Sequence, residues 1–118
     1  MNDKKFYIPG DQIKDILTDW DGADGCLATD RITVDGCKVG YCYREDPDGD
    51  WDSGWRFFAG DESDEYVNDP DNTAIYKLNT ICNYDPDILK ILHSPCNTAY
   101  GRDKNGELVE EDFFPPEE

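Results

Sequence analysis

Four aspartates alternate along one short acidic segment, and this spacing suggests that they could bind calcium. They are Asp46, Asp48, Asp50 and Asp52. A calcium loop of the EF-hand type needs glycine at its sixth position and glutamate at its twelfth. Counted from Asp46, those positions hold Trp51 and Phe57. The register that starts at Asp48 fails in the same way, so we expect no metal site and keep a divalent-cation-binding or regulatory module as the alternative function.

Cysteine and histidine give a second candidate for chemistry. Cys82, His93 and Cys96 have a spacing compatible with zinc, but a structural zinc site usually takes four such ligands, and the sequence does not single out a fourth. A catalytic cysteine–histidine pair would also need an oxyanion-hole motif, which does not follow. The five cysteines are therefore interpreted as free thiols that pack as small hydrophobic residues.

Hydrolytic chemistry is not indicated either. Ser53 lacks the Gly-x-Ser-x-Gly frame of a nucleophilic serine, because tryptophan stands on both sides where glycine is needed. A hydrolase with paired carboxylates has 28 acidic residues to draw on, but nothing in the sequence picks out two of them. We expect a protein without catalytic residues and without a cofactor.

The charge of the chain restricts its partners. The 28 acidic and 11 basic residues leave a formal net charge of −17 over 118 residues. Nucleic acid is excluded as an expected partner, because phosphate binding needs a basic face. A basic protein is favoured, since opposite charges accelerate association. The acidity also fits an alternative in which charge serves solubility alone.

The location follows from what the sequence lacks. The chain shows no apolar run of the ~20 residues that a membrane helix needs, so we expect no membrane association. Its first residues do not form a secretory signal, and an odd number of cysteines argues against a disulfide framework. These features predict a cytoplasmic protein.

Acidic loops form the candidate partner-binding site. Two acidic segments, residues 45–52 and 61–71, flank the apolar block Trp55-Arg56-Phe57-Phe58. The block can be buried, whereas the acidic segments must stay in water. Large aromatic residues among exposed acids are typical of contacts with a basic partner. The candidate contact residues are Asp46, Asp48, Asp50, Trp51, Asp52, Asp61, Glu62, Asp64, Glu65 and Tyr66.

The same region carries a resemblance to a known family. The run Asp-Ser-Gly-Trp-Arg-Phe-Phe-Ala-Gly-Asp-Glu, residues 52–62, and the segment 75–88 resemble the bacterial immunity protein 33 family, with the likeness running from about Ala28 to Pro95. That family is named for neighbouring toxin genes. The resemblance implies an immunity-type protein that binds and neutralises a cognate toxin by occluding its active site, and it supplies no catalytic residues.

The elements that must position these residues are predicted from periodicity and turn chemistry. Two short helices are expected, over residues 11–20 and 86–93, and Asp85 and Pro86 suit the start of the second. The apolar residues of the first helix share one face: Ile13, Ile16, Leu17 and Trp20. Strands are expected over residues 25–29, 37–43, 54–59, 74–78, 97–102 and 107–109.

Alternation within the strands assigns the core. Trp55 and Phe57 share one face of the third expected strand, and Arg56 and Phe58 share the other. Ile75 is expected to point inwards with Trp55 and Phe57. For Arg56, pairing with an acid inside the fold is favoured over facing a ligand.

These elements predict one α+β domain over residues 1–118. Its sheet is expected to be mainly antiparallel, with four to six strands packed by the two short helices. We divide the domain into an N-terminal helix region, residues 1–24, a core, residues 25–109, and an acidic tail, residues 110–118. The paired phenylalanines Phe113 and Phe114 are the tail residues suited to pack back onto the domain.

Overall fold

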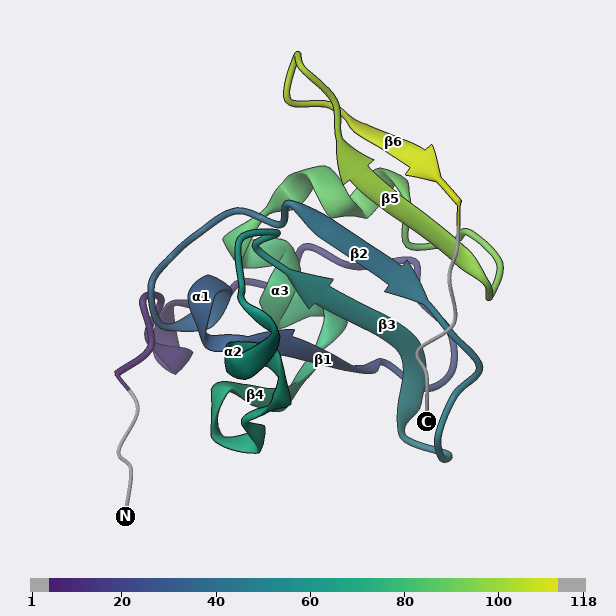
Figure 1. Cartoon of the computed structure of the whole chain (residues 1–118). Coiled ribbons are helices and arrows are strands. Elements are labelled where there is room, and N and C mark those ends of the chain that lie inside the picture. Colours follow the sequence, from purple (N-terminus) through teal and green to yellow (C-terminus); the bar gives the residue numbers. More distant parts are fainter. Residues whose placement is uncertain (1–4, 113–118) are drawn as a thin grey trace.

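The computed structural model describes residues 5–112, which form a six-stranded mixed sheet with short helices (Figure 1). The strand order is β4-β1-β3-β2-β5-β6. Within residues 5–112, only the pairing of β1 with β3 is parallel, and the other four pairings are antiparallel. The expected α+β class and mainly antiparallel sheet are confirmed. The strands are β1 (Gly25–Thr29), β2 (Tyr41–Arg44), β3 (Asp52–Phe58), β4 (Thr73–Lys77), β5 (Thr98–Arg102) and β6 (Leu108–Glu111).

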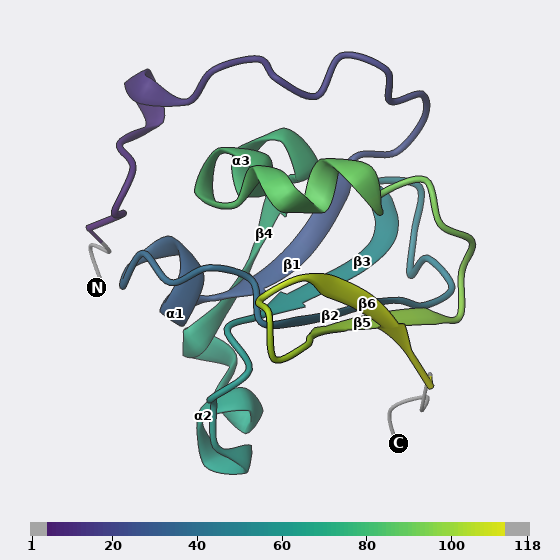
Figure 2. The same ribbon diagram turned by 90° about the horizontal axis from the view of Figure 1, so that it is seen from above.

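The helices are short and lie on different sides of the sheet. Figure 2 shows α3 and the N-terminal segment on one side and α2 on the opposite side. The core lies between the sheet and α3, and it includes Trp55, Phe57, Ile81 and Leu92, all fully buried. The helical elements are α1 (Asp30–Thr33), α2 (Asp64–Asn68) and α3 (Leu78–Tyr84), with the 3-10 turns η1 (Gly10–Gln12), η2 (Pro70–Asn72) and η3 (Pro86–Lys90).

The expected helix over residues 11–20 is wrong. Only the turn η1 forms there, and the chain then runs in irregular conformation across the outer side of α3 (Figure 2). The apolar positions are nevertheless the half-buried ones of this segment. Their backbone is bound by α3 instead of by a helix of their own: Asn79 Oδ1 accepts hydrogen bonds from the amides of Ile16 and Leu17, at 2.9 and 3.0 Å.

The second expected helix begins as predicted but is a 3-10 turn. Asp85 caps it by accepting a hydrogen bond from the amide of Asp87 at 3.1 Å, and Pro86 holds the first position. The other carboxylate oxygen of Asp85 accepts from the amide of Val39 at 3.0 Å and pairs with Arg102. This cap therefore joins η3 to the sheet, and its carboxylate is fully buried.

The inward orientation expected for Ile75 is wrong, because its side chain is 60% exposed. β4 is an edge strand, and its register places Ile75 opposite Leu27 on the sheet face away from α3. Because side chains alternate along a strand, a neighbour, Tyr76, turns to the covered face and contacts the core.

The C-terminal boundary differs slightly from expectation. β6 continues to Glu111, so the first two residues of the expected tail pair with β5. Residues 113–118, including Phe113 and Phe114, lie outside the described part of the chain. Within residues 5–112, helices with the length and apolarity to cross a membrane are absent.

Candidate partner-binding surface

Strands β2 and β3 place aromatic rings on the sheet face that points away from α3. Tyr41 pairs with Phe58 and Tyr43 pairs with Arg56, so these four side chains share that face. The rings of Tyr43 and Phe58 stack with centroids 5.9 Å apart, and the ring of Tyr41 lies 6.1 Å from each of them. We call this cluster of Tyr41, Tyr43 and Phe58 the aromatic face. The predicted split of Trp55 and Phe57 from Arg56 and Phe58 is confirmed.

Two adjacent hollows open on the aromatic face. The larger, of about 490 Å³, lies toward α2 and is lined by Leu27, Tyr43, Arg56 and Phe58, among others. The smaller, of about 250 Å³, is lined by all three rings and by Glu62. Val67, from α2, lines both hollows and is 39% exposed. The floor of each hollow is therefore mainly aromatic and aliphatic.

An ion-paired arginine lies under the larger hollow. Arg56 is only 5% exposed and binds both oxygens of Asp52 through its two terminal nitrogens, at 2.8 and 2.9 Å. Its Nε donates to Glu45 at 2.6 Å. Burial alone would lower the pKa of Arg56, but the two carboxylates outweigh it and raise that pKa. The role within the fold that we favoured for Arg56 is confirmed.

Asp52 belongs to the interior, unlike the other acids of its loop. Its side chain is fully buried and also accepts hydrogen bonds from the amides of Asp48 and Gly54, each at 2.8 Å. Burial raises the pKa of Asp52, but the hydrogen bonds from Arg56 and the two amides reverse the shift and lower the pKa to about 2. Asp52 therefore fixes the start of β3, and we leave it out of the contact surface.

Gly54 explains the local shape of this strand. Its φ is +94°, a conformation that favours glycine, and a Cβ there would meet the carbonyl oxygen of Glu45 at 2.2 Å. Only glycine lets β3 approach the end of β2 so closely. This contact keeps Glu45 beside Arg56.

The remaining candidates of the first loop are exposed. Asp46, Asp48 and Asp50 lie in the connection between β2 and β3. Trp51 is 41% exposed, and its ring edge rests on Gly25, where a Cβ would lie 2.6 Å from the ring. Trp51 is thus anchored to β1 and still open to contact.

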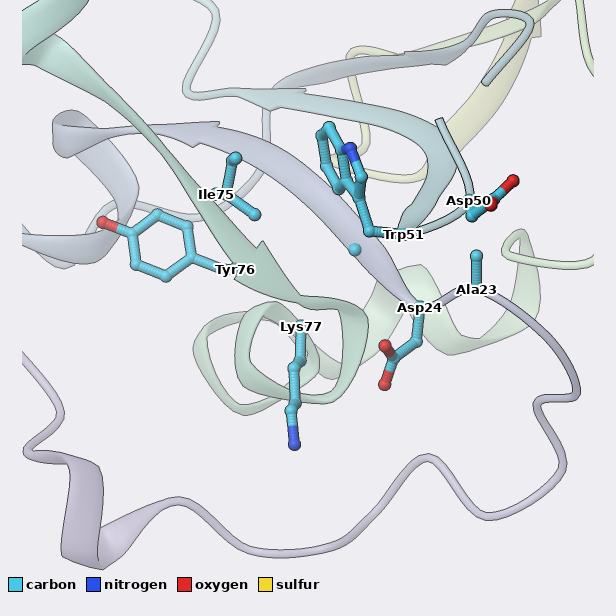
Figure 3. A pocket seen from close by; sticks show the side chains of 8 residues that line it. Ala23, Asp24, Asp50, Trp51, Ile75, Tyr76 and Lys77 are labelled. Atoms are coloured by element: carbon cyan, nitrogen blue, oxygen red, sulfur yellow. The ribbon is translucent and has the colours of Figure 1, made fainter. Parts of the chain in front are cut away.

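A third hollow, of about 560 Å³, extends the surface toward the edge strand. Trp51 and Ile75 stand on either side of β1, and Asp24, Asp50 and Lys77 lie nearby (Figure 3). Like the aromatic face, this hollow combines exposed apolar side chains with acids, but it also contains Lys77.

The second acidic loop lies at the other end of β3. Asp64 and Glu65 are exposed in the first turn of α2, and Tyr66 is half-buried. Glu62 folds back and accepts hydrogen bonds from the amides of Ala59 and Gly60, each at 2.8 Å.

Asp61 in this loop pairs with Arg31 at 2.6 Å, and the hydrogen bond from that arginine lowers the pKa of Asp61. β3 separates this loop from the first one. The two acidic loops therefore border opposite ends of the aromatic face and do not form one patch.

The residues considered for metal chemistry are scattered. Cys82 is buried, and burial raises the pKa of its thiol to about 12. His93 is on the surface, 3.1 Å from Asp19. Across residues 5–112, no three His, Cys, Asp or Glu side chains are grouped to hold a metal ion. Of the four alternating aspartates that suggested calcium binding, Asp52 is already paired with Arg56.

The sequence-based site omitted the aromatic face itself. Tyr41 and Tyr43 alternate with Cys42, which places both tyrosines on one face of a strand, whereas Val39, two residues earlier, is fully buried. The difference arises because β2 begins only at Tyr41. Which side of the sheet would be covered by helices was not readable from that pattern.

Comparison with known families gives a match. The family model of the immunity protein Imm33 domain matches residues 26–112, which include nearly the whole sheet, α3 and the aromatic face. The irregular N-terminal segment lies outside the match. Among curated proteins and solved structures, none matches the chain.

Proposed function

This chain belongs to the Imm33 immunity protein family, and from that membership we propose that it binds and neutralises a cognate protein toxin. The observation that supports a binding role is the aromatic face, which the described helices leave largely open and which acidic loops border at both ends. Partly exposed aromatic residues surrounded by acids suit a partner with a basic surface.

Neutralisation would proceed by occlusion of the toxin's active site. The exposed acids Asp46, Asp48 and Asp50 would face basic residues around that site, with Trp51 and Tyr66 as apolar anchors. At a net charge of −17 the whole chain attracts a basic partner before contact, so association would be fast and would weaken with salt. We expect this encounter in the cytoplasm, and the chain's role in it would be non-enzymatic.

Co-expression of the chain with candidate toxin genes tests the proposal. We expect the chain to restore growth and to bind the purified toxin with an affinity that falls at least tenfold between 50 and 500 mM salt. Failure of the native chain to protect and to bind would overturn the proposal.

A matched pair of triple variants tests the acidic loop. Changing Asp46, Asp48 and Asp50 to Asn should weaken binding at least tenfold, because charges in a contact region are removed. The control changes Asp11, Asp15 and Asp21 to Asn, which removes the same charge from exposed positions outside the family match. Equal effects of both variants would contradict a contact role for the loop and leave only the overall charge.

A further inference from the structure

The aromatic face has the composition of an interaction surface. Three rings lie together on one sheet face, and Leu27 and Val67 extend the apolar area on the side of α2. Ile75 and Trp51 continue it across β1 and β4. Contiguous exposed apolar surface of this kind costs solubility unless something covers it, and it marks binding sites in soluble proteins.

The walls of the hollows are negatively charged. Arg56 is matched by two carboxylates, Asp52 and Glu45, so the ion cluster carries a net negative charge, and Glu45 is 28% exposed. Burial, followed by the charge of Glu45, raises the pKa of Tyr43 to about 12. Burial and then Glu111 likewise raise the pKa of Tyr41. Both tyrosines therefore lie in the negative field of nearby carboxylates, and their hydroxyl groups stay protonated at neutral pH.

Aromatic floors with acidic walls select one kind of side chain. Arginine and lysine carry a long apolar stem and a cationic end, so the stem can lie on the rings while the charge meets the carboxylates. A purely apolar side chain would leave the excess negative charge of the ion cluster uncompensated, and an acidic one would be repelled.

We infer that the aromatic face is the surface that binds the toxin, and that its two hollows receive arginine or lysine side chains from an extended basic segment of that toxin. This inference rests on the proposed function. The hollows share Tyr43, Phe58 and Val67, so they are adjacent. An extended chain places every second side chain on one side, roughly 6.4–6.8 Å apart, so alternate basic residues suit adjacent hollows.

A peptide titration of the full chain tests the surface directly. The probe is acetyl-Arg-Thr-Arg-Thr-Arg-amide, and its control carries citrulline in place of arginine, which keeps the shape and removes the charge. By NMR we expect saturable shifts at the three rings and at Val67 with the arginine peptide, and none with the citrulline peptide. Shifts confined to the acidic loops, or equal shifts with both peptides, would overturn the inference.

Two valine variants locate the binding site. Val67 and Val109 are both 39% exposed, but only Val67 lines the hollows, since Val109 lies on the edge strand β6. Val67→Arg should weaken binding of the peptide and of the toxin at least tenfold, because the new guanidinium occupies the hollows. Val109→Arg adds the same charge and should change affinity less than threefold. Equal losses would overturn the inference.

The remaining outcomes separate this inference from the proposed function. If the Val67→Arg variant still binds the toxin, the aromatic face is not the binding surface, and the proposed immunity function is unaffected. Peptide binding by a chain that neither binds nor neutralises the toxin would overturn the proposed function. Peptide binding that appears only after removal of residues 113–118, or a dimer that buries the same rings, would assign the face to the chain itself and overturn the inference.

Discussion

At the scale of single residues, the ion cluster of Arg56, Asp52 and Glu45 joins the fold to the candidate surface. Asp52 begins β3, Arg56 lies farther along the same strand and Glu45 directly follows β2. Arg56 and Glu45 line the larger hollow, and Asp52 binds Arg56. Removing one partner of a buried pair leaves the other charge without compensation, which is more costly than losing an exposed pair. Residues in this cluster should therefore affect stability first and binding second.

Asp52→Asn should lower the free energy of unfolding by about 3 kcal/mol, because Arg56 would keep only Glu45 as a charged partner. Urea unfolding at pH 7 measures the change. The control is Asp50→Asn, at an exposed position two residues earlier, which should change stability by less than about 0.5 kcal/mol. Similar values for both variants would contradict the buried role of Asp52.

The same carboxylate predicts a dependence on pH. Asp52 has a pKa of about 2 in the folded protein, below the ordinary value near 4. A depressed pKa gives stability that is complete above the ordinary pKa and is lost as the pH falls through the folded one. The stability difference between the native chain and Asp52→Asn should therefore shrink between pH 4 and pH 2. A difference that stays constant over this range would contradict the assignment.

At the scale of elements, α3 binds the N-terminal segment through asparagine side chains. Asn79 and Asn83 lie one turn apart, and both donate to the carbonyl of Lys14, at 2.9 Å each. Farther along, Trp20 lies 5.2 Å from the ring of His93 and from the guanidinium of Arg44. These contacts replace the internal hydrogen bonds that a helix over residues 11–20 would have made.

Asn79→Ala should release this segment from α3. It removes two acceptor bonds and one donor bond to backbone groups of residues 14–17, so we expect about 2 kcal/mol of lost stability. Amide exchange of Ile16 and Leu17 should accelerate at least tenfold. Asn105→Ala, in the exposed turn before β6, is the control and should leave both amides protected. Unchanged exchange in Asn79→Ala would contradict the role of α3.

The edge strand gives a second test at this scale. Ile75 and Ile81 are both isoleucines, but their environments differ: Ile75 on β4 is 60% exposed, and Ile81 on α3 is fully buried. Ile75→Thr should change the free energy of unfolding by less than about 0.5 kcal/mol, since threonine also suits a strand. Ile81→Thr should cost about 3 kcal/mol, because it leaves a cavity and buries a hydroxyl. Thermal or urea unfolding distinguishes the two, and equal costs would contradict the exposure of Ile75.

At the scale of the whole molecule, charge repulsion opposes folding. With a net charge of −17, the compact state is destabilised by its own field, and added salt screens that repulsion. The surface ion pairs compensate only in part; an example is Lys90 with Glu107, whose charged atoms are 3.9 Å apart and largely exposed.

Sodium chloride at 0.5 M should therefore raise the melting temperature by several degrees, as about 1 kcal/mol shifts a domain of this size by ~4 °C or more. Calcium chloride at matched ionic strength should raise it no further. A larger shift with calcium than with magnesium would favour the divalent-cation alternative, because a ligand that binds only the folded state stabilises it.

Local chemistry let the sequence determine much of this protein by itself. Asp85 and Pro86 start η3, β1 spans its expected residues, and Trp55 and Phe57 lie in the core, because caps, turns and strand alternation act between near neighbours. The charge and the family resemblance were likewise readable from composition and residue order.

Tertiary structure decided whether an apolar pattern became a helix and which face of the sheet the helices covered. The spacing of residues 11–20 correctly indicated which side chains are partly buried. A helix does not form there, because an asparagine side chain of α3, more than 60 residues away in sequence, binds the backbone amides instead. Packing of α3 on one face left Tyr41, Tyr43 and Ile75 on the other. Asp52 became interior because Arg56 lies beside it with the geometry to bind both oxygens. Long-range contacts decide these features, since periodicity identifies an apolar face without identifying what covers it.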